Sequence, residues 1–195
     1  MFTGLIEKKV QVAEIESLSE NKRMCLDAPG FDLAIGDSLA VNGVCLTVDS
    51  IENDRPNFHI LEETLSKTNL GTLSEGDFVN IEQPLKLNDR LDGHIVSGHV
   101  DCVSELLKLE SLASDHRLTF KLESENAMLV IPMGSIAVNG VSLTIAELNT
   151  TSFTVCLIPH SWEITNLSEL TTGSKANIEF DMMGKYILRN QELTV

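Results

Sequence analysis

The stretch SLAVNGVCLTV at Ser38–Val48 returns almost unchanged as SIAVNGVSLTI at Ser135–Ile145, with eight of eleven positions identical. Each copy places Asn-Gly between two short apolar runs, which is a strong signal for a two-residue β-hairpin turn. One of the three differences puts Cys45 where the second copy has Ser142. The sequence therefore predicts the same hairpin twice, with a thiol in one copy and a hydroxyl in the other.

The repeat extends well beyond this hairpin. Downstream, Glu63–Pro84 aligns with His160–Asp181 at the same separation of 97 residues. Upstream, Thr3–Ile15 resembles Ser97–Leu109 more loosely, at a separation of 94 residues. Because a unit of this length is too long for a solenoid repeat, we expect two copies of one small domain.

These alignments suggest the domain boundaries. The first domain covers residues 1–96 and includes a linker at 85–96, the second covers 97–184, and a helical tail covers 185–195. Short runs of β-branched and aromatic residues predict about six strands in each domain, with short helices at EETLSKTNLG and SWEITNLSEL. We expect an all-β fold in which each domain closes into an antiparallel barrel, since closure leaves no exposed sheet edge.

Alternation along the repeated strand separates two faces. Val44, Leu46 and Val48 point one way and belong in a core, while Cys45 and Thr47 point the other way. In the second copy the corresponding small polar pair is Ser142 and Thr144. These pairs are available to a ligand or to a neighbouring surface. The simpler alternative is that they are ordinary solvated residues and that Cys45 is an inert thiol.

The composition narrows the functional classes. With 29 acidic and 14 basic residues, the chain carries a net charge of −15, which argues against nucleic acids and anionic membranes as partners. No apolar run approaches the roughly 18 residues needed to span a membrane. The start, MFTGLIEKK, does not resemble a signal peptide, so we expect a cytoplasmic protein.

The cysteines and histidines show no metal-binding pattern. The four cysteines lie far apart and form no C-x-x-C pair, so we expect reduced thiols. His94 and His99 lie five residues apart, but no carboxylate or third ligand completes a recognisable site. We therefore expect no metal.

Several blocks occur in the order and spacing of a known family. They include MFTGLIE, VNGVCLTV, ETLSKTNLG, LDGHIVSGHVD, LIPHSWEITNL and NIEFD. Over nearly its whole length the chain resembles riboflavin synthases of the alpha-subunit type, in the lumazine-binding tandem barrel family. This resemblance implies two six-stranded Greek-key barrels, a C-terminal helix and a homotrimer. It also leaves open an association with lumazine synthase.

The resemblance also implies a reaction. Riboflavin synthases convert two molecules of 6,7-dimethyl-8-ribityllumazine into riboflavin and 5-amino-6-(D-ribitylamino)uracil, without a cofactor or a metal. One lumazine donates a four-carbon unit to the other. Two homologous barrels that each bind one lumazine would hold the pair in opposed orientation, which makes the encounter effectively unimolecular.

Candidate catalytic residues follow from the same resemblance. Ser142 and Thr144 are expected to hydrogen-bond the heterocycle, and His99 is a proton-transfer candidate that also positions Thr144. Cys45 and Asp181 are expected to support them. Removing a proton from the lumazine methyl group requires a base and a stabilised anion.

Candidate substrate-binding residues form two matching sets. Met133 is added to them at a position where many relatives have a lysine. The set expected in the N-terminal barrel is Gly4, Leu5, Ile6, Cys45, Leu46, Thr47, His59, Ile60, Leu61, Glu62, Glu63 and Thr64. The set expected in the C-terminal barrel is Gly98, His99, Val100, Ser142, Leu143, Thr144, Leu157, Ile158, Pro159, His160, Ser161 and Trp162.

Proteins with a second function share this tandem fold. Lumazine proteins, which are fluorescent antenna proteins, bind one lumazine or flavin in the N-terminal barrel and carry out no chemistry. They typically lose the second half-site, whereas SGHVD and VSLT are intact here. The sequence therefore favours an enzyme over an antenna protein or a structural module.

Overall fold

The chain folds into two closed six-stranded antiparallel barrels, which confirms the predicted architecture. The computed structural model describes residues 1–112 and 115–193. The N-terminal barrel contains β1 (Lys8–Leu18), β2 (Asn21–Asp27), β3 (Ser38–Val41), β4 (Val44–Glu52), β5 (Arg55–Ile60) and β6 (Phe78–Glu82). The C-terminal barrel contains β7 (Cys102–Ser111), β8 (His116–Lys121), β9 (Ser135–Val138), β10 (Val141–Leu148), β11 (Ser152–Leu157) and β12 (Lys175–Phe180).

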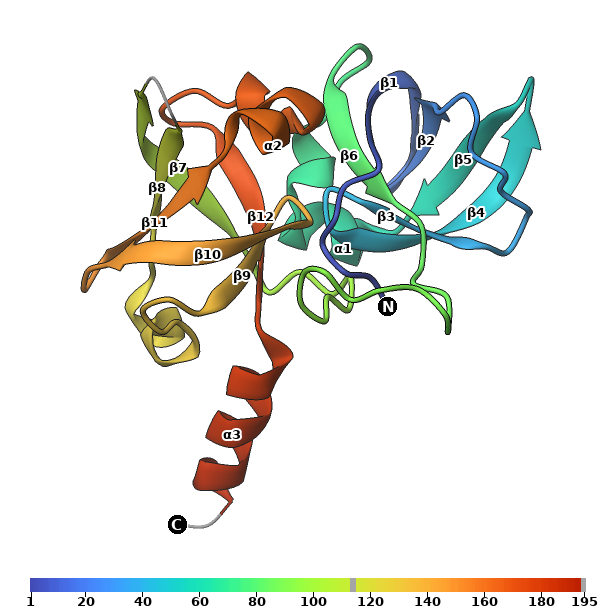
Figure 1. The fold of residues 1–195 in the computed structure, drawn as a ribbon. Helices are drawn as coiled ribbons and strands as arrows, with labels where there is room; N and C mark the ends of the chain where they lie inside the picture. The colour runs from blue at the N-terminus through green and yellow to red at the C-terminus, as the bar shows by residue number, and fades with distance from the viewer. Residues whose placement is uncertain (113–114, 194–195) are drawn as a thin grey trace.

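Both barrels have the same topology. Around the first barrel the order is β1-β2-β5-β4-β3-β6, and around the second it is β7-β8-β11-β10-β9-β12. Figure 1 shows the two barrels side by side. Short helices join the strands: α1 (Glu62–Lys67) and η1 (Asn69–Thr72), then η2 (Ser124–Leu129), α2 (Pro159–Ile164) and η3 (Asn166–Glu169).

The repeated hairpins form as predicted. Asn42 and Gly43 join β3 to β4 with φ values of 47° and 76°, and Asn139 and Gly140 join β9 to β10 with 46° and 80°. Positive φ at both turn positions is what Asn-Gly supplies at low cost. The two turns also touch, because a Cβ atom on Gly43 would lie 2.8 Å from the Gly140 nitrogen. The hairpins therefore fix how the barrels meet.

The predicted alternation of faces is also present in the structure. Val44, Leu46 and Val48 are buried in the core of the N-terminal barrel, while Cys45 is only half-buried and Thr47 is exposed. Each barrel has its own core, and a smaller cluster of Phe2, Ala40, Val96 and Ala137 lies between the two cores, with Cys45 packed against it.

Six buried asparagines connect the barrels. They are three pairs separated by 97 residues: Asn42 and Asn139, Asn69 and Asn166, Asn80 and Asn177. The bonds cross between barrels in both directions: the Asn69 amide donates to Asn177 Oδ1 (2.6 Å), and the Asn166 amide donates to Asn80 Oδ1 (2.6 Å). A buried network whose members satisfy one another fixes a single arrangement of its parts.

Replacing Asn166 by alanine is expected to lower the free energy of unfolding by about 2–4 kcal/mol. The Asn166 side chain donates to Asn42 Oδ1 and to the Phe78 carbonyl, and it accepts from Asn139 Nδ2, so its loss leaves buried groups unpaired. Chemical denaturation measures the change, with the exposed Asn88→Ala as the control. Equal stabilities for the two variants would contradict a structural role for the network.

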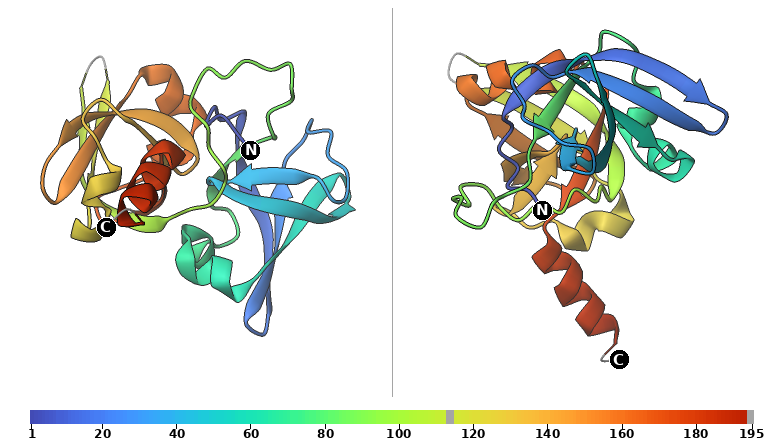
Figure 2. Two further views of the ribbon diagram at one scale, coloured as in Figure 1. Left: turned by 90° about the horizontal axis from the view of Figure 1, so that it is seen from below. Right: turned by 90° about the vertical axis from the view of Figure 1, so that its right-hand side faces the viewer.

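The C-terminal helix α3 (Met182–Glu192) projects away from both barrels (Figures 1 and 2). Asp181 caps it by accepting the Met183 amide at 2.9 Å. The helix thus begins three residues before the expected tail at 185–195, of which residues 194–195 lie outside the described part of the chain.

Candidate active site

The segments that precede the two barrels are exchanged between them. The Ser142 amide donates to the Gly4 carbonyl at 2.8 Å, and Ile6 packs against the core of the C-terminal barrel. In the same way, the Cys45 amide donates to the Gly98 carbonyl at 2.9 Å, and Val100 packs against the core of the N-terminal barrel. The strands β4 and β10, which carry the small polar pairs, are therefore each hydrogen-bonded to a segment that precedes the other barrel.

This exchange corrects the grouping expected from the sequence. The segment Gly4–Ile6 belongs with Ser142 rather than with Cys45, and Gly98–Val100 belongs with Cys45 rather than with Ser142. We call the groups around Cys45 the first half-site and the groups around Ser142 the second half-site. The same hydrogen bond, from a strand amide to a glycine carbonyl, forms in both half-sites. Alignment of the repeats alone therefore cannot reveal the exchange.

Two buried glutamates hold the exchanged segments. Glu82 accepts the Thr3 amide (2.6 Å), the Thr3 hydroxyl (2.7 Å) and the Gly4 amide (3.1 Å). Glu179 holds Ser97 and Gly98 in the same way, at 2.7, 2.7 and 3.0 Å. Burial raises the pKa of the Glu82 carboxyl, and the hydrogen bonds from Thr3 and Gly4 offset part of that rise. Both glutamates recur in NIE segments of the repeat, but their role was missed from sequence.

The first half-site lies beside a pocket of about 490 Å³. All of its lining residues come from the N-terminal barrel, on β4, at the end of β5, in α1 and in the loop before β3. Four further residues line the pocket, and nothing in their local sequence points to a ligand: Ile35, Gly36, Val48 and Asp49. The predicted residues among the lining are Cys45, Leu46, Thr47, His59, Ile60, Leu61 and Thr64. Glu62 and Glu63, which begin α1, are exposed and are not among the lining residues.

The second half-site is built from β10, β11 and α2, which correspond to β4, β5 and α1 of the first half-site, but some of its side chains differ. Ser142 and the exposed Thr144 lie on β10, and the segment from Leu157 to Trp162 runs from the end of β11 into α2. The Trp162 ring stacks on His116 with centroids 4.0 Å apart. Ile158 and His160 are exposed, whereas the side chain of Leu157 is buried in the core and can offer a ligand only its backbone.

Met133 occupies the position that Gly36 holds in the first half-site. The Met133 amide donates to the Ile145 carbonyl at 3.1 Å, as the Gly36 amide donates to Val48 at 2.9 Å, and both residues have positive φ. Met133 is 75% exposed. The second half-site therefore carries a flexible thioether where the first half-site has no side chain.

Two predicted catalytic residues take unexpected places. The segment that carries His99 lies against the first half-site, whereas Thr144 lies in the second, and no hydrogen bond of the described residues joins them. Within one chain, His99 therefore does not position Thr144. Asp181 caps α3, and Asp101 binds Lys185 of that helix at 2.6 Å.

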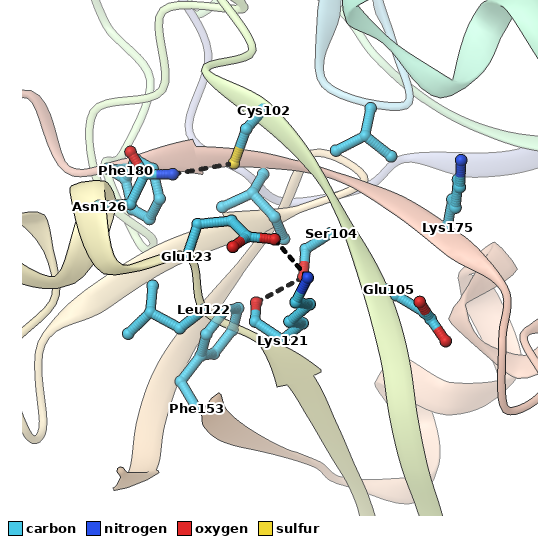
Figure 3. Close-up of a pocket in the computed structure, with 12 residues that line it drawn as sticks. Cys102, Ser104, Glu105, Lys121, Leu122, Glu123, Asn126, Phe153, Lys175 and Phe180 are labelled. Carbon is cyan, nitrogen blue, oxygen red and sulfur yellow. Dashed lines mark hydrogen bonds and ion pairs between the residues drawn. The ribbon is translucent and has the colours of Figure 1, made fainter. Parts of the chain in front are cut away.

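A separate cavity of about 270 Å³ opens in the wall of the C-terminal barrel, between β7, β12 and the end of β8 (Figure 3). Asn126 donates to the Cys102 sulfur at 3.7 Å, and Ser104 donates to the Lys121 carbonyl at 2.6 Å. None of its lining residues was predicted to bind substrate. Burial, together with the charge of Asp101, raises the pKa of Cys102 to about 11, so this thiol is a poor nucleophile near neutral pH.

Alkylation of Cys102 at pH 8 is expected to be about 100-fold slower than alkylation of an exposed cysteine, because only the thiolate reacts. The rate should rise about tenfold per pH unit until the pH approaches its pKa of about 11. Peptide mass spectrometry after iodoacetamide treatment measures it, with the urea-unfolded chain as the control. Rapid labelling of Cys102 in the folded protein at pH 8 would show that its thiol is not protected.

The described part of the chain offers neither a metal site nor a membrane-spanning helix. Among residues 1–112 and 115–193, no group of three or more His, Cys, Asp or Glu side chains could hold a metal ion. No helix in these ranges has both the length and the apolar character needed to cross a membrane.

Comparisons with known proteins agree with the tandem-barrel fold. Residues 3–84 and 97–181 each match the family described as "Lumazine binding domain". Riboflavin synthase of Bacillus subtilis is 38% identical over 97% of this chain and 89% of its own length. The enzyme of Mycobacterium tuberculosis H37Rv is 39% identical, with 97% of both chains covered. Crystal structures of LumP with riboflavin and with 6,7-dimethyl-8-(1'-D-ribityl) lumazine share the fold, with TM-scores of 0.86 and 0.84, 24% and 23% identity, 92% coverage of this chain, and 99% and 98% of theirs.

Proposed function

The chain belongs to the riboflavin synthase family, and on this premise we propose that it converts two molecules of 6,7-dimethyl-8-ribityllumazine into riboflavin and 5-amino-6-(D-ribitylamino)uracil. The observation that carries the proposal is the pair of half-sites, each completed by the segment exchanged from the other half of the chain. A reaction between two identical molecules needs two similar binding sites, and the two half-sites are the candidates for them. The two products contain the same atoms as two lumazines, so the transfer of the four-carbon unit needs no added oxidant.

Each half-site seats one flat heterocycle. Cys45 and Ser142 have small side chains, and the glycines at 4 and 98 let the exchanged segments pack directly against them, because a Cβ atom on either glycine would lie 2.6 Å from the Cβ atom of Ser142 or Cys45. In this proposal Ser142 and Thr144 hydrogen-bond the heterocycle, while His99 moves the proton of the reacting methyl group and Asp181 supports it. Holding both molecules in contact contributes much of the rate by removing the entropy cost of their encounter.

In this proposal the first half-site of one subunit meets the second half-site of another. Because the pocket beside Cys45 is lined only by the N-terminal barrel, a second lumazine must be brought to it by another surface. The C-terminal barrel of a neighbouring copy supplies that surface in a homotrimer. Exposed apolar residues on one face of α3, Met183, Tyr186 and Ile187, are suited to hold the copies together. A cytoplasmic location and an association with lumazine synthase remain predictions.

Replacing Tyr186 and Ile187 by glutamate together is expected to leave monomers and to lower activity at least tenfold, since charges on this face oppose its burial against another copy. Sedimentation velocity measures the molecular mass, with Glu192→Lys on the opposite face of α3 as the control. A wild-type chain that sediments as an active monomer would contradict assembly through α3.

Incubating the purified protein with 6,7-dimethyl-8-ribityllumazine alone tests the proposed reaction. We expect riboflavin to appear, with one molecule formed for every two lumazines consumed. The alternative function is that of an antenna protein, and the shared fold with LumP is the observation that favours it. Stable lumazine fluorescence without any riboflavin would favour the antenna protein and reject the enzyme.

A further inference from the structure

A histidine from the linker contacts the hydroxyl of the second half-site. His94 Nδ1 lies 2.7 Å from Ser142 Oγ, and the His94 amide donates to the Thr3 carbonyl at 3.1 Å. The ring is buried, with 9% of the residue exposed. Its other nitrogen, Nε2, is buried and has no hydrogen-bond partner among the described residues. A buried polar atom without a partner is costly, and such atoms in native proteins call for an explanation.

This contact exists on one half-site only. Cys45 holds the same position in the first half-site, and no hydrogen bond of the described residues reaches its thiol. Its packing partners there are Phe2 and the other residues of the cluster between the barrels. The difference between the half-sites is therefore larger than the exchange of a thiol for a hydroxyl. It includes an imidazole that is hydrogen-bonded to the hydroxyl, whereas no hydrogen bond of the described residues joins an imidazole to the thiol.

We propose that His94 is a positioning residue, which fixes the hydroxyl of Ser142 toward the lumazine in the second half-site and thereby makes the two seats unequal. The inference rests on the proposed function for the identity of the ligand. A serine hydroxyl turns freely unless a partner holds it. With the imidazole occupying one hydrogen-bonding direction of Oγ, the remaining directions are free for the heterocycle.

The surroundings of the ring keep it suited to this task. Burial lowers the pKa of His94, while the carboxylates of Asp181 and Glu179 act in the opposite direction. The ring is therefore neutral at pH 7, with one nitrogen that donates and one that accepts. In either tautomer the bond to Ser142 Oγ is retained. Where Nδ1 is the acceptor, the hydroxyl proton points at the ring and the oxygen lone pairs are left for the heterocycle.

A matched pair of substitutions tests the proposal. The amide of asparagine can replace Nδ1, so His94→Asn should keep the bond to Ser142 and stay within about threefold of wild-type kcat. The amide of glutamine reaches the place of Nε2 instead, so His94→Gln should lower kcat about 10- to 100-fold. In a Ser142→Ala background, His94→Gln should have little further effect, because the two residues act through one bond. Equal losses in both His94 variants, or additive losses with Ser142→Ala, would overturn the proposal.

Two readouts do not depend on turnover. Trp162, the single tryptophan of the chain, lies in the second half-site, so riboflavin bound there should quench its emission. Affinity for riboflavin should fall in His94→Gln but not in His94→Asn, even if wild-type protein makes no riboflavin from lumazine. If His94→Gln does not fold, NMR of labelled histidine decides: the Nδ1 resonance of His94 must change in Ser142→Ala, and an unchanged resonance would overturn the proposal.

Discussion

Ser142→Ala is expected to lower the rate of riboflavin formation by about 100- to 1,000-fold, the loss typical of a hydrogen-bonding group that acts in the transition state. The side chain lies on the non-core face of β10, where its hydroxyl bonds His94, while its amide donates to Gly4. Removing the hydroxyl therefore removes a contact to the heterocycle and the partner of His94, while the strand remains intact.

Steady-state kinetics and thermal unfolding together measure this effect. Ser124→Ala, at the exposed start of η2, is the matched control and should leave both properties unchanged. Cys45→Ala should also lower turnover sharply if the first half-site holds the second lumazine. Near-normal rates in both Ser142→Ala and Cys45→Ala would refute the assignment of these residues to the site.

Gly98→Ala is expected to reduce activity about 100-fold, because a displacement of roughly 1 Å in a catalytic site can cost that much. The new Cβ atom would lie 2.6 Å from the Cβ atom of Cys45, which is closer than real Cβ contacts. The segment that delivers His99 and Val100 must then move away from the first half-site.

Gly76→Ala separates this crowding from backbone strain. Gly76 and Gly98 have similar φ values, 88° and 84°, but nothing lies within 4 Å of a Cβ atom on Gly76. Both variants should lose stability from an alanine with positive φ, Gly98→Ala more because of the added crowding, and only Gly98→Ala should lose activity. A Gly76→Ala variant as inactive as Gly98→Ala would show that strain alone accounts for the loss.

Local signals in the sequence predicted most of the fold. The Asn-Gly turns, the alternation of Val44, Leu46 and Val48, and the separation of 97 residues required two similar β-barrels, and the structure has both. The contact between barrels was not predictable in the same way. Asn42, Asn69 and Asn80 recur in the repeat, but only the packed chain shows that they bond across the interface.

The candidate site was predicted in part. Seven predicted residues line the pocket of the first half-site. The exchange of Gly4–Ile6 and Gly98–Val100 was missed because these contacts join residues more than fifty positions apart, and both assignments satisfy the repeat equally well. The sequence presents His94 only as a candidate metal ligand, because its partner Ser142 lies 48 positions away.

The differences between the half-sites are concentrated where a ligand would lie. Cys45 in the first repeat corresponds to Ser142 in the second, and Gly36 corresponds to Met133. His94 hydrogen-bonds only to the second half-site. In the proposed reaction one lumazine donates carbon and the other receives it, and we expect these differences to set which half-site holds the donor. Glu82 and Glu179, which are common to the two repeats, instead hold the exchanged segments in the same way in both half-sites.

Mixed oligomers test most directly whether the first half-site of one subunit and the second half-site of another together form the active site. One chain carries Cys45→Ala and Thr47→Ala, the other carries Ser142→Ala and Thr144→Ala, and the two are co-expressed with different affinity tags. Each variant alone should be nearly inactive, and oligomers that contain both should regain a substantial share of the wild-type rate. Full activity in the second variant alone, or no recovery in the mixed oligomers, would contradict the assembly of one site from two half-sites on different subunits.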